Sequence, residues 1–204
     1  MSRPCLIGIA GPSCAGKTEL SRRLATLLPA PILPLDGYYF DLAHLSPAER
    51  AQRNFDTPEV FDQSLFLQHL KALAQGRGIS RPVYDFAAHA RTGRVEIVTP
   101  APFLVVEGLL LFHWEEVRKL LSLRVYVDLD EPSCLERRLL RDVKERGRAP
   151  ESVRRQFAET VRPMAEKYIY PTRSFADLLV RGDAPVEDSV AAVMERVRSL
   201  SGSI

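Results

Sequence analysis

The sequence GPSCAGKT at residues 11–18 has the spacing of a phosphate-binding loop, G-x-x-x-x-G-K-[ST]. The apolar run Cys5–Ala10 precedes it and is typical of a buried strand. In the segment that follows, leucines recur at the spacing of one helical face: Leu20, Leu24, Leu27 and Leu28. A strand, a tight loop and a helix in this order are the context that such a loop requires.

The residue types in this loop indicate what it binds. Gly11 and Gly16 let the backbone curl so that its N–H groups point at phosphate oxygens, next to the positive end of the following helix. Lys17 is expected to reach the β- and γ-phosphates, and the Thr18 hydroxyl to bind Mg²⁺. The other loop residues expected at the donor nucleotide are Ser13, Ala15 and Glu19, while Cys14 is read as a small neutral filler.

Composition narrows the class of protein. The chain has 204 residues, which suits one domain, 1–204, with a small appendage. We expect a cytoplasmic protein without a membrane segment, because no apolar run reaches 18 residues and the N-terminus lacks the pattern of a signal peptide. Three widely spaced cysteines fit a reducing compartment. A net charge of +2 is too small to argue for a nucleic-acid partner, and none is expected.

Strand and helix patterns alternate along the chain, which predicts parallel pairing with crossover helices. Strands are expected at 5–10, 32–36, 103–107, 123–129 and 176–180. Helices are expected after the loop and at about 60–75, 132–146, 151–168 and 185–200. The fold class is α/β, a three-layer α/β/α P-loop NTPase fold with a mostly parallel five-stranded sheet. Two additions are expected, a β-hairpin insertion at about 78–99 and an arginine-rich helical lid at about 137–156.

The fold alone does not decide which reaction is catalysed. A switch GTPase would carry Asn-Lys-x-Asp and Asp-x-x-Gly motifs, and neither string occurs. The string LDGYYFD at residues 35–41 places Asp36 at the carboxyl end of a strand, where ligands of such folds bind. Asp36 is expected to orient an attacking hydroxyl and accept its proton. The alternative is that Asp36 only shapes an Asp-Gly turn.

Two acids compete for the position that holds Mg²⁺ through water. Glu107 follows the strand FLVV, and Asp128 follows RVYV. We favour Glu107, because its strand is the more fully apolar and because Gly108 leaves room beside the phosphates. The other acid would then be a residue of a strand-end turn.

Arginines crowd into RRLLRDVKERGR at residues 137–148. Arg138 and Arg141 share a helical face, and Gly147 is expected to break the helix between Arg146 and Arg148. Arginines beside such a hinge can close over a nucleotide and neutralise charge on the transferred phosphoryl group. The alternative is a solvated helix face with ion pairs to Asp142 and Glu145.

With these motifs placed, the chain resembles the uridine kinase (uridine–cytidine kinase) family over roughly residues 5–182. The strings that carry the resemblance are GPSCAGKT, LDGYYFD, NFDTPEVFD (54–62), YDFAAHAR (84–91), VVEGLLLF (105–112), RRLLRDVKERGR and YIYPTRSFADLLV (168–180). The resemblance implies transfer of the γ-phosphoryl group of ATP or GTP to the 5′-hydroxyl of uridine or cytidine, with Mg²⁺. It also implies a homotetramer.

By the same resemblance, Asp36 is the catalytic base, Lys17 and Arg141 are catalytic, Arg146 binds the donor and Glu107 binds the metal. The positions that the resemblance assigns to the acceptor, besides Asp36 and Arg141, are Tyr39, Phe55, Asp56, Tyr84, His89, Arg138, Arg148 and Gln156. Their chemistry agrees with this, since an aromatic ring such as that of Tyr84 offers a base a stacking surface. Asp56 can bond ribose hydroxyls, and His89 can read a pyrimidine edge.

One departure bears on the acceptor. Thr57 stands where the family usually has histidine, which leaves the shape of the acceptor pocket open. A related kinase acting on ribulose 5-phosphate, pantothenate or nicotinamide riboside is therefore the main alternative, although YDFAAHAR is suited to reading a base. A nucleotide-sensing RNA-binding module that uses Arg137–Arg155 as its contact surface is a further alternative.

Overall fold

A computed structural model of the chain describes residues 4–46, 49–50, 53–86 and 88–201. Five strands form one sheet in the order β2-β5-β1-β6-β7, and all four pairings are parallel. Their bounds are β1 Cys5–Ala10, β2 Ile32–Pro34, β5 Phe103–Glu107, β6 Leu123–Asp128 and β7 Leu178–Arg181. The predicted P-loop architecture is therefore confirmed, with strands that are buried on both faces.

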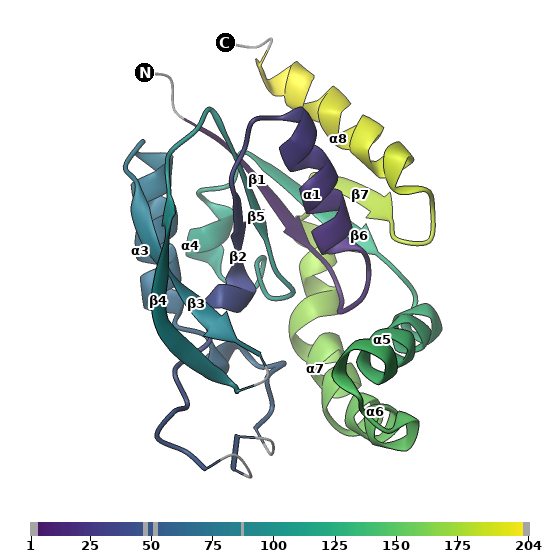
Figure 1. The fold of residues 1–204 in the computed structure, drawn as a ribbon. Coiled ribbons are helices and arrows are strands. Elements are labelled where there is room, and N and C mark those ends of the chain that lie inside the picture. Colours follow the sequence, from purple (N-terminus) through teal and green to yellow (C-terminus); the bar gives the residue numbers. More distant parts are fainter. Residues whose placement is uncertain (1–3, 47–48, 51–52, 87, 202–204) are drawn as a thin grey trace.

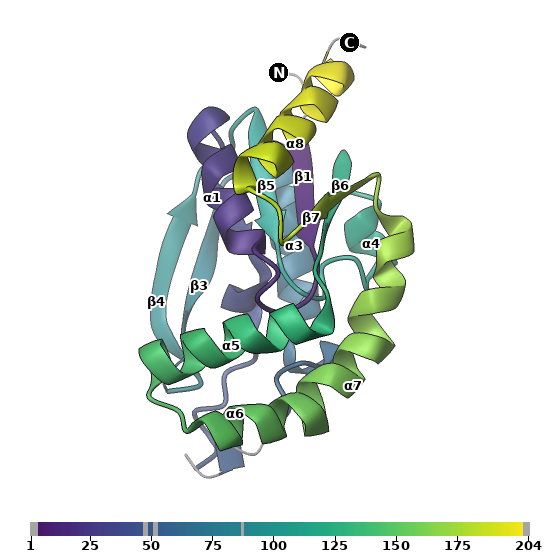
Figure 2. The same cartoon turned by 90° about the vertical axis from the view of Figure 1, so that its right-hand side faces the viewer.

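Alternate residues of the strands enter two different cores, as the two-residue period of a strand requires. On one face, Ile7 and its neighbours pack under α1 (Lys17–Leu27) and α8 (Val186–Ser201). On the other face, Leu6 and its neighbours pack against α3 (Gln63–Ala74) and α4 (Glu115–Arg118). Figures 1 and 2 show α1 and α8 together on their side of the sheet. The expected three layers are present.

Two details of the helices differ from the expectation. Leu27 lies on the outside of α1 and is 58% exposed, while Leu28, just past the last turn, takes the buried position. Helix α3 begins at Gln63 and not near Val60, because the Asp62 side chain caps it by accepting the N–H of Leu65 at 3.1 Å. Phe61 is buried as expected, although it lies in extended chain bridged to Tyr39.

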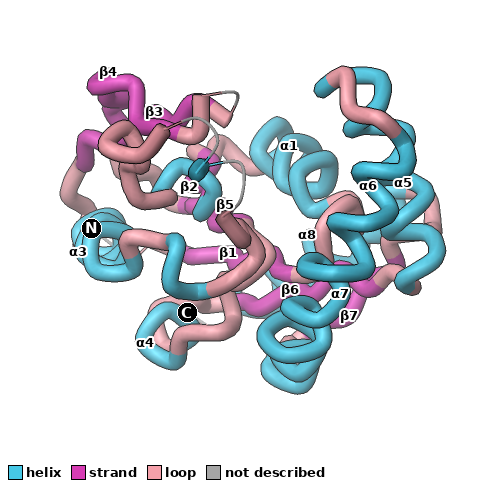
Figure 3. The backbone as a smooth tube through the Cα atoms, turned by 90° about the horizontal axis from the view of Figure 1, so that it is seen from below, coloured by secondary structure: helices cyan, strands magenta, loops and turns pink. Residues whose placement is uncertain are grey.

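The predicted hairpin and lid flank the end of the sheet where β1 runs into the phosphate loop. The hairpin is β3 (Ile79–Asp85) paired antiparallel with β4 (Ala90–Val98). The lid is α5 (Glu131–Arg146) followed by α6 (Pro150–Gln156), and Gly147 joins them with a φ of 63°. Figure 3 shows the hairpin and the lid on opposite sides of the molecule. Ala87, within the string YDFAAHAR, lies outside the described residues.

Past α6 the chain stays helical through a series of short turns. These are η3 (Phe157–Val161), α7 (Arg162–Met164), η4 (Ala165–Ile169) and η5 (Tyr170–Phe175), of which η3 and η4 are π-helical. Shorter 3₁₀ turns lie at η1 (Leu35–Tyr38) and η2 (Pro58–Val60). Among the described residues, the helices are too short or too polar to cross a bilayer.

Candidate active site

The phosphate loop joins β1 to α1 and is built as its sequence predicts. Gly11 and Gly16 have φ values of 141° and 106°, which strain any residue with a Cβ. A Cβ on Gly11 would also clash with the carbonyl oxygen of Val127 on the neighbouring strand. Lys17, the first residue of α1, donates from Nζ to the Pro12 carbonyl oxygen at 2.7 Å. The lysine thus lies folded across the loop that is expected to hold phosphate.

Glu107, the last residue of β5, faces this loop. Its Oε1 accepts a hydrogen bond from the Thr18 hydroxyl at 3.2 Å. Burial raises the pKa of Glu107, the nearby Asp36 adds to the increase, and Lys17 opposes it. Asp128, the alternative candidate, points elsewhere and forms an ion pair with Arg173 at 2.9 Å. The structure therefore places Glu107, and not Asp128, beside Thr18.

The Thr18 hydroxyl and the Glu107 carboxylate are the oxygen ligands that Mg²⁺ prefers. Across the residues that the structure describes, no group of three or more His, Cys, Asp or Glu side chains is arranged to hold a metal by itself. A pair of oxygen ligands suits a magnesium ion that takes its remaining ligands from phosphate and water. The residues present therefore fit a nucleotide-borne Mg²⁺.

Two cavities meet above the carboxyl end of the sheet. The smaller, of about 340 Å³, lies against the phosphate loop and is lined by residues that include Lys17, Thr18 and Glu19 together with Glu107. The larger, of about 640 Å³, lies between the hairpin and the lid. Four residues line both: Ser13, Asp36, Leu109 and Arg141. The two cavities therefore adjoin at these four residues.

Asp36 lies in η1, directly after β2, and its environment is unusual for a carboxylate. Its Oδ1 atom is buried and has no hydrogen-bond partner among the described residues. Burial raises the pKa of Asp36, and this effect outweighs the attraction of Lys17, Arg141 and Arg146. An unpartnered buried acceptor at the junction of the two cavities can take a hydrogen bond from a ligand hydroxyl. The structural-turn alternative gives no reason for an unpartnered oxygen at this place.

Aromatic side chains form one wall of the larger cavity. The Phe55 and His89 rings stack with centroids 4.5 Å apart and an interplanar angle of 17°. Tyr84, expected to offer a stacking surface, instead packs against Tyr39 at 5.2 Å and Phe86 at 5.4 Å, and its hydroxyl has no partner in the described part of the chain. The cavity thus combines flat apolar surfaces with a buried hydroxyl.

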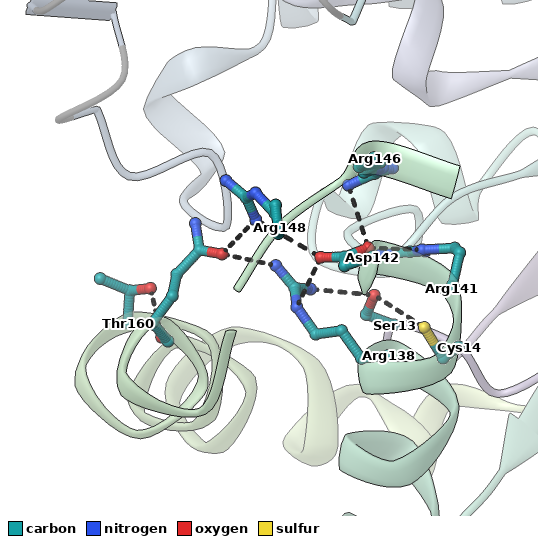
Figure 4. Close-up of polar contacts among 9 residues, drawn as sticks. Ser13, Cys14, Arg138, Arg141, Asp142, Arg146, Arg148 and Thr160 are labelled. Atoms are coloured by element: carbon teal, nitrogen blue, oxygen red, sulfur yellow. Dashed lines mark hydrogen bonds and ion pairs between the residues drawn. The ribbon is translucent and has the colours of Figure 1, made fainter. Parts of the chain in front are cut away.

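The lid supplies the opposite wall. Arg138 and Arg148 both donate to Oε1 of Gln156, at 3.2 and 2.7 Å, so that α5 and α6 are joined across the Gly147 turn. Arg138 also donates to the Ser13 hydroxyl at 3.3 Å, which ties the lid to the phosphate loop (Figure 4). Arg146, expected on the donor side, lines the larger cavity. The solvated-face alternative is wrong for Arg138, which is only 6% exposed.

A family model described as "Phosphoribulokinase / Uridine kinase family" matches residues 6–186 of this sequence. The chain belongs to this family. Its curated relatives include a uridine kinase from Brevibacillus brevis, 41% identical over 183 residues that make up 88% of this chain and 86% of the relative. A uridine kinase from Clostridium tetani is 40% identical over 181 residues, 87% of each chain. The family resemblance read from the seven strings is confirmed.

A solved structure from a Silicibacter species, described as a candidate fructose transport system kinase, superimposes with a TM-score of 0.71. The superposition covers 88% of this chain and 91% of that one, at 22% sequence identity. At this identity the likeness shows the fold alone. Because fold alone does not decide the substrate, the acceptor has to be argued from the larger cavity.

Within this family member, most predicted site residues meet around the two cavities. Asp56 and Gln156 line the larger cavity, and Glu19 lines the smaller. Ala15, expected at the donor nucleotide, is fully buried and lines neither cavity. Thr57 is not among the residues that line the larger cavity. Its hydroxyl instead donates a hydrogen bond to the Glu59 carboxylate beside η2.

Four residues of the larger cavity were missed by sequence reasoning: Arg53, Phe86, Leu109 and Glu145. Arg53 directly precedes the string NFDTPEVFD, and Phe86 lies within YDFAAHAR. Glu145 lies within RRLLRDVKERGR. Their positions in those strings were the available signal. Without knowledge of how the hairpin and lid face each other, their side chains could not be assigned to a common cavity.

Proposed function

We propose that this member of the family is a pyrimidine ribonucleoside kinase that transfers the γ-phosphoryl group of ATP or GTP to the 5′-hydroxyl of uridine or cytidine. The observation that carries the proposal is the meeting of a phosphate-loop cavity and an aromatic-walled cavity at Asp36 and Arg141. The relatives named uridine kinase support the choice of acceptor. The three cysteines are free, which supports a reducing, cytoplasmic setting.

The smaller cavity takes the donor. The loop amides and Lys17 bind the β- and γ-phosphates, with the Lys17 ammonium leaving the Pro12 carbonyl for phosphate oxygen. Thr18 and Glu107 would hold Mg²⁺, which would supply neutralisation of the charge that develops on the transferred group. Arg141 reaches the same group from the lid, since it lines both cavities.

The larger cavity takes the nucleoside, with its 5′-hydroxyl at Asp36. Oδ1 of Asp36 accepts the hydroxyl proton as the oxygen attacks the γ-phosphorus, and the raised pKa makes the carboxylate a better base than an exposed aspartate. Asp56, half-buried in the lining of the same cavity, bonds ribose hydroxyls. The stacked Phe55 and His89 rings lie at the edge of the pyrimidine.

The proposal is tested by a coupled ADP-release assay with Mg·ATP and a panel of acceptors. The panel contains uridine, cytidine, adenosine, nicotinamide riboside, pantothenate and ribulose 5-phosphate, and mass spectrometry identifies each product. Formation of UMP or CMP at the highest kcat/KM supports the proposal. A higher kcat/KM for one of the other acceptors would leave the donor site as described and reject the nucleoside assignment.

His89 is expected to influence the choice between uridine and cytidine. Burial lowers its pKa, and the neighbouring Arg148, Arg146 and Arg50 lower it further, so that the imidazole is neutral near pH 7. A neutral imidazole has one donor and one acceptor nitrogen, and the two bases differ in this respect at C4. His89→Ala should therefore change the ratio of the two kcat/KM values by roughly tenfold, the effect of about one hydrogen bond.

The matched control is His44→Ala, which removes an exposed histidine of the preceding loop. Steady-state kinetics with both nucleosides should show an unchanged ratio for this variant. An equal loss for uridine and cytidine in His89→Ala would mean that His89 only supports Phe55.

A further inference from the structure

One carboxylate lies at the centre of the lid arginines. Asp142 of α5 is completely buried, and four guanidinium groups surround it, as Figure 4 shows. Arg141 Nε donates to Oδ1 at 2.9 Å, and Arg146 Nη1 lies 3.4 Å from the same oxygen. On Oδ2, Arg148 Nη1 donates at 3.4 Å and Arg138 Nε lies at 3.7 Å. All four arginines line the larger cavity, and Asp142 lies behind them.

The charges of this cluster do not balance. Burial alone would raise the pKa of Asp142, but the hydrogen bond from Arg141 and the charges of Arg141, Arg146 and Arg138 outweigh it and lower the pKa below the usual range. The carboxylate therefore stays ionised at neutral pH. One negative charge faces four positive ones, so the cluster retains positive charge toward the cavity and attracts anions.

The main chain of Asp142 fixes the same cluster. Its carbonyl oxygen accepts the N–H of Gly147 and, at 3.1 Å, the N–H of Arg148. These bonds close the end of α5 and turn the chain so that Arg148 points back toward the helix it has just left. The Asp142 side chain thus gathers the guanidinium groups, and its main-chain carbonyl accepts the hydrogen bonds that close the turn at Gly147.

We propose that Asp142 is a positioning residue that serves as the internal counter-ion of the lid arginines. In the ligand-free protein its carboxylate, which lies behind the arginines, supplies the negative charge that a phosphate would supply from the cavity, and it holds Arg141 and Arg146 in place. When a phosphate group enters, these two side chains exchange part of their contact with Asp142 for contact with the ligand. The identity of that phosphate rests on the proposed function, whereas the counter-ion role does not.

Asp142→Asn keeps the shape of the side chain and removes its charge. With the carboxylate gone, added anions should compensate the arginines, so inorganic pyrophosphate should bind roughly tenfold more tightly, a change of about 1.4 kcal/mol. At the same time the arginines lose their fixed arrangement, so kcat should fall by roughly tenfold or more without a rise in the KM for ATP. A residue that only stabilised the helix would not strengthen anion binding while weakening turnover.

Isothermal titration with pyrophosphate and steady-state kinetics measure these two effects. Asp142→Glu restores the charge and should return pyrophosphate affinity to within about twofold of the wild type. The matched control, Glu136→Gln, removes a carboxylate from the exposed face of the same helix and should leave both quantities nearly unchanged. Unchanged or weaker pyrophosphate binding in folded Asp142→Asn would overturn the proposal.

Removing a buried charge from an ion cluster can prevent folding. In that case pyrophosphate should restore the far-UV circular dichroism and raise the melting temperature of Asp142→Asn more than that of the wild type. Failure of pyrophosphate to do so would also overturn the proposal. The pyrophosphate measurement needs no nucleoside. If the wild-type enzyme were inactive on uridine and cytidine, the proposed acceptor would be rejected, but the pyrophosphate result would still test the counter-ion role of Asp142.

Discussion

Asp36→Asn is expected to lower kcat by roughly 10²-fold or more while Mg·ATP binds with nearly unchanged affinity. The amide occupies the same space as the carboxylate but cannot accept the proton of the attacking hydroxyl. The affinity for ATP should be preserved because the phosphate loop and Lys17 remain intact. Stopped-flow or quench-flow single turnovers, together with titration by a non-hydrolysable ATP analogue, separate the two quantities.

Asp36 should also determine the acid limb of the pH profile. Since the base must be ionised, wild-type kcat/KM rises with pH through the pKa of Asp36, which burial places above the usual value of about 4. This limb should be absent from the residual activity of Asp36→Asn. Asp128→Asn is the matched control, because Asp128 also lies at the carboxyl end of the sheet yet pairs with Arg173, and its kcat should stay near that of the wild type. Near-normal turnover in Asp36→Asn would remove Asp36 from the mechanism.

Lys17→Ala is expected to reduce kcat by roughly 10²- to 10³-fold, the usual effect of removing one preorganised electrostatic contact to the transition state. Nucleotide affinity should fall by a smaller factor, because the loop amides continue to bind the phosphates. The loss has a second cause. Lys17 is a cation near both Glu107 and Asp36, and its charge lowers the pKa of each. Without it, the proposed base and metal ligand become easier to protonate.

This double role gives the Lys17 experiment a distinctive readout. In Lys17→Ala the acid limb of the pH profile should move to higher pH, in addition to the overall loss of activity. Lys71→Ala, which removes an exposed lysine from the last turn of α3, serves as the control and should match the wild type. If turnover survives Lys17→Ala unchanged, the phosphate loop has been misread.

The central fold could be predicted from the sequence because its signals are local. The apolar strands β1, β5 and β6 lie within one residue of their expected bounds. Helix α5 ends at Gly147, as expected for a glycine that breaks a helix. Leu27 shows the limit of such patterns. Both Leu27 and Leu28 fit a helical face, and only the packing of α1 against the sheet decides that Leu28 is the buried one.

The place of a site residue could be predicted where it depends on position along a strand or loop, as for Glu107 and Thr18, which lie within hydrogen-bond distance of each other. It could not be predicted where the role depends on which elements face each other. Asp142 looked like one partner in surface ion pairs, but its burial and the gathering of Arg148 around it follow from the turn between α5 and α6. Likewise, the stacking of Phe55 on His89 joins two strings that are more than thirty residues apart.

The four residues that line both cavities also bear on the order of substrate binding and product release. Asp36 and Arg141 line both cavities, so under the proposed function donor and acceptor are expected to bind together and the phosphoryl group to cross in one displacement. Such an arrangement implies a sequential kinetic order through a ternary complex, with no phosphorylated enzyme released between half-reactions. A single in-line displacement of this kind also inverts the configuration at phosphorus. The product formed from an ATP analogue with a chiral γ-thiophosphate should therefore have the inverted configuration.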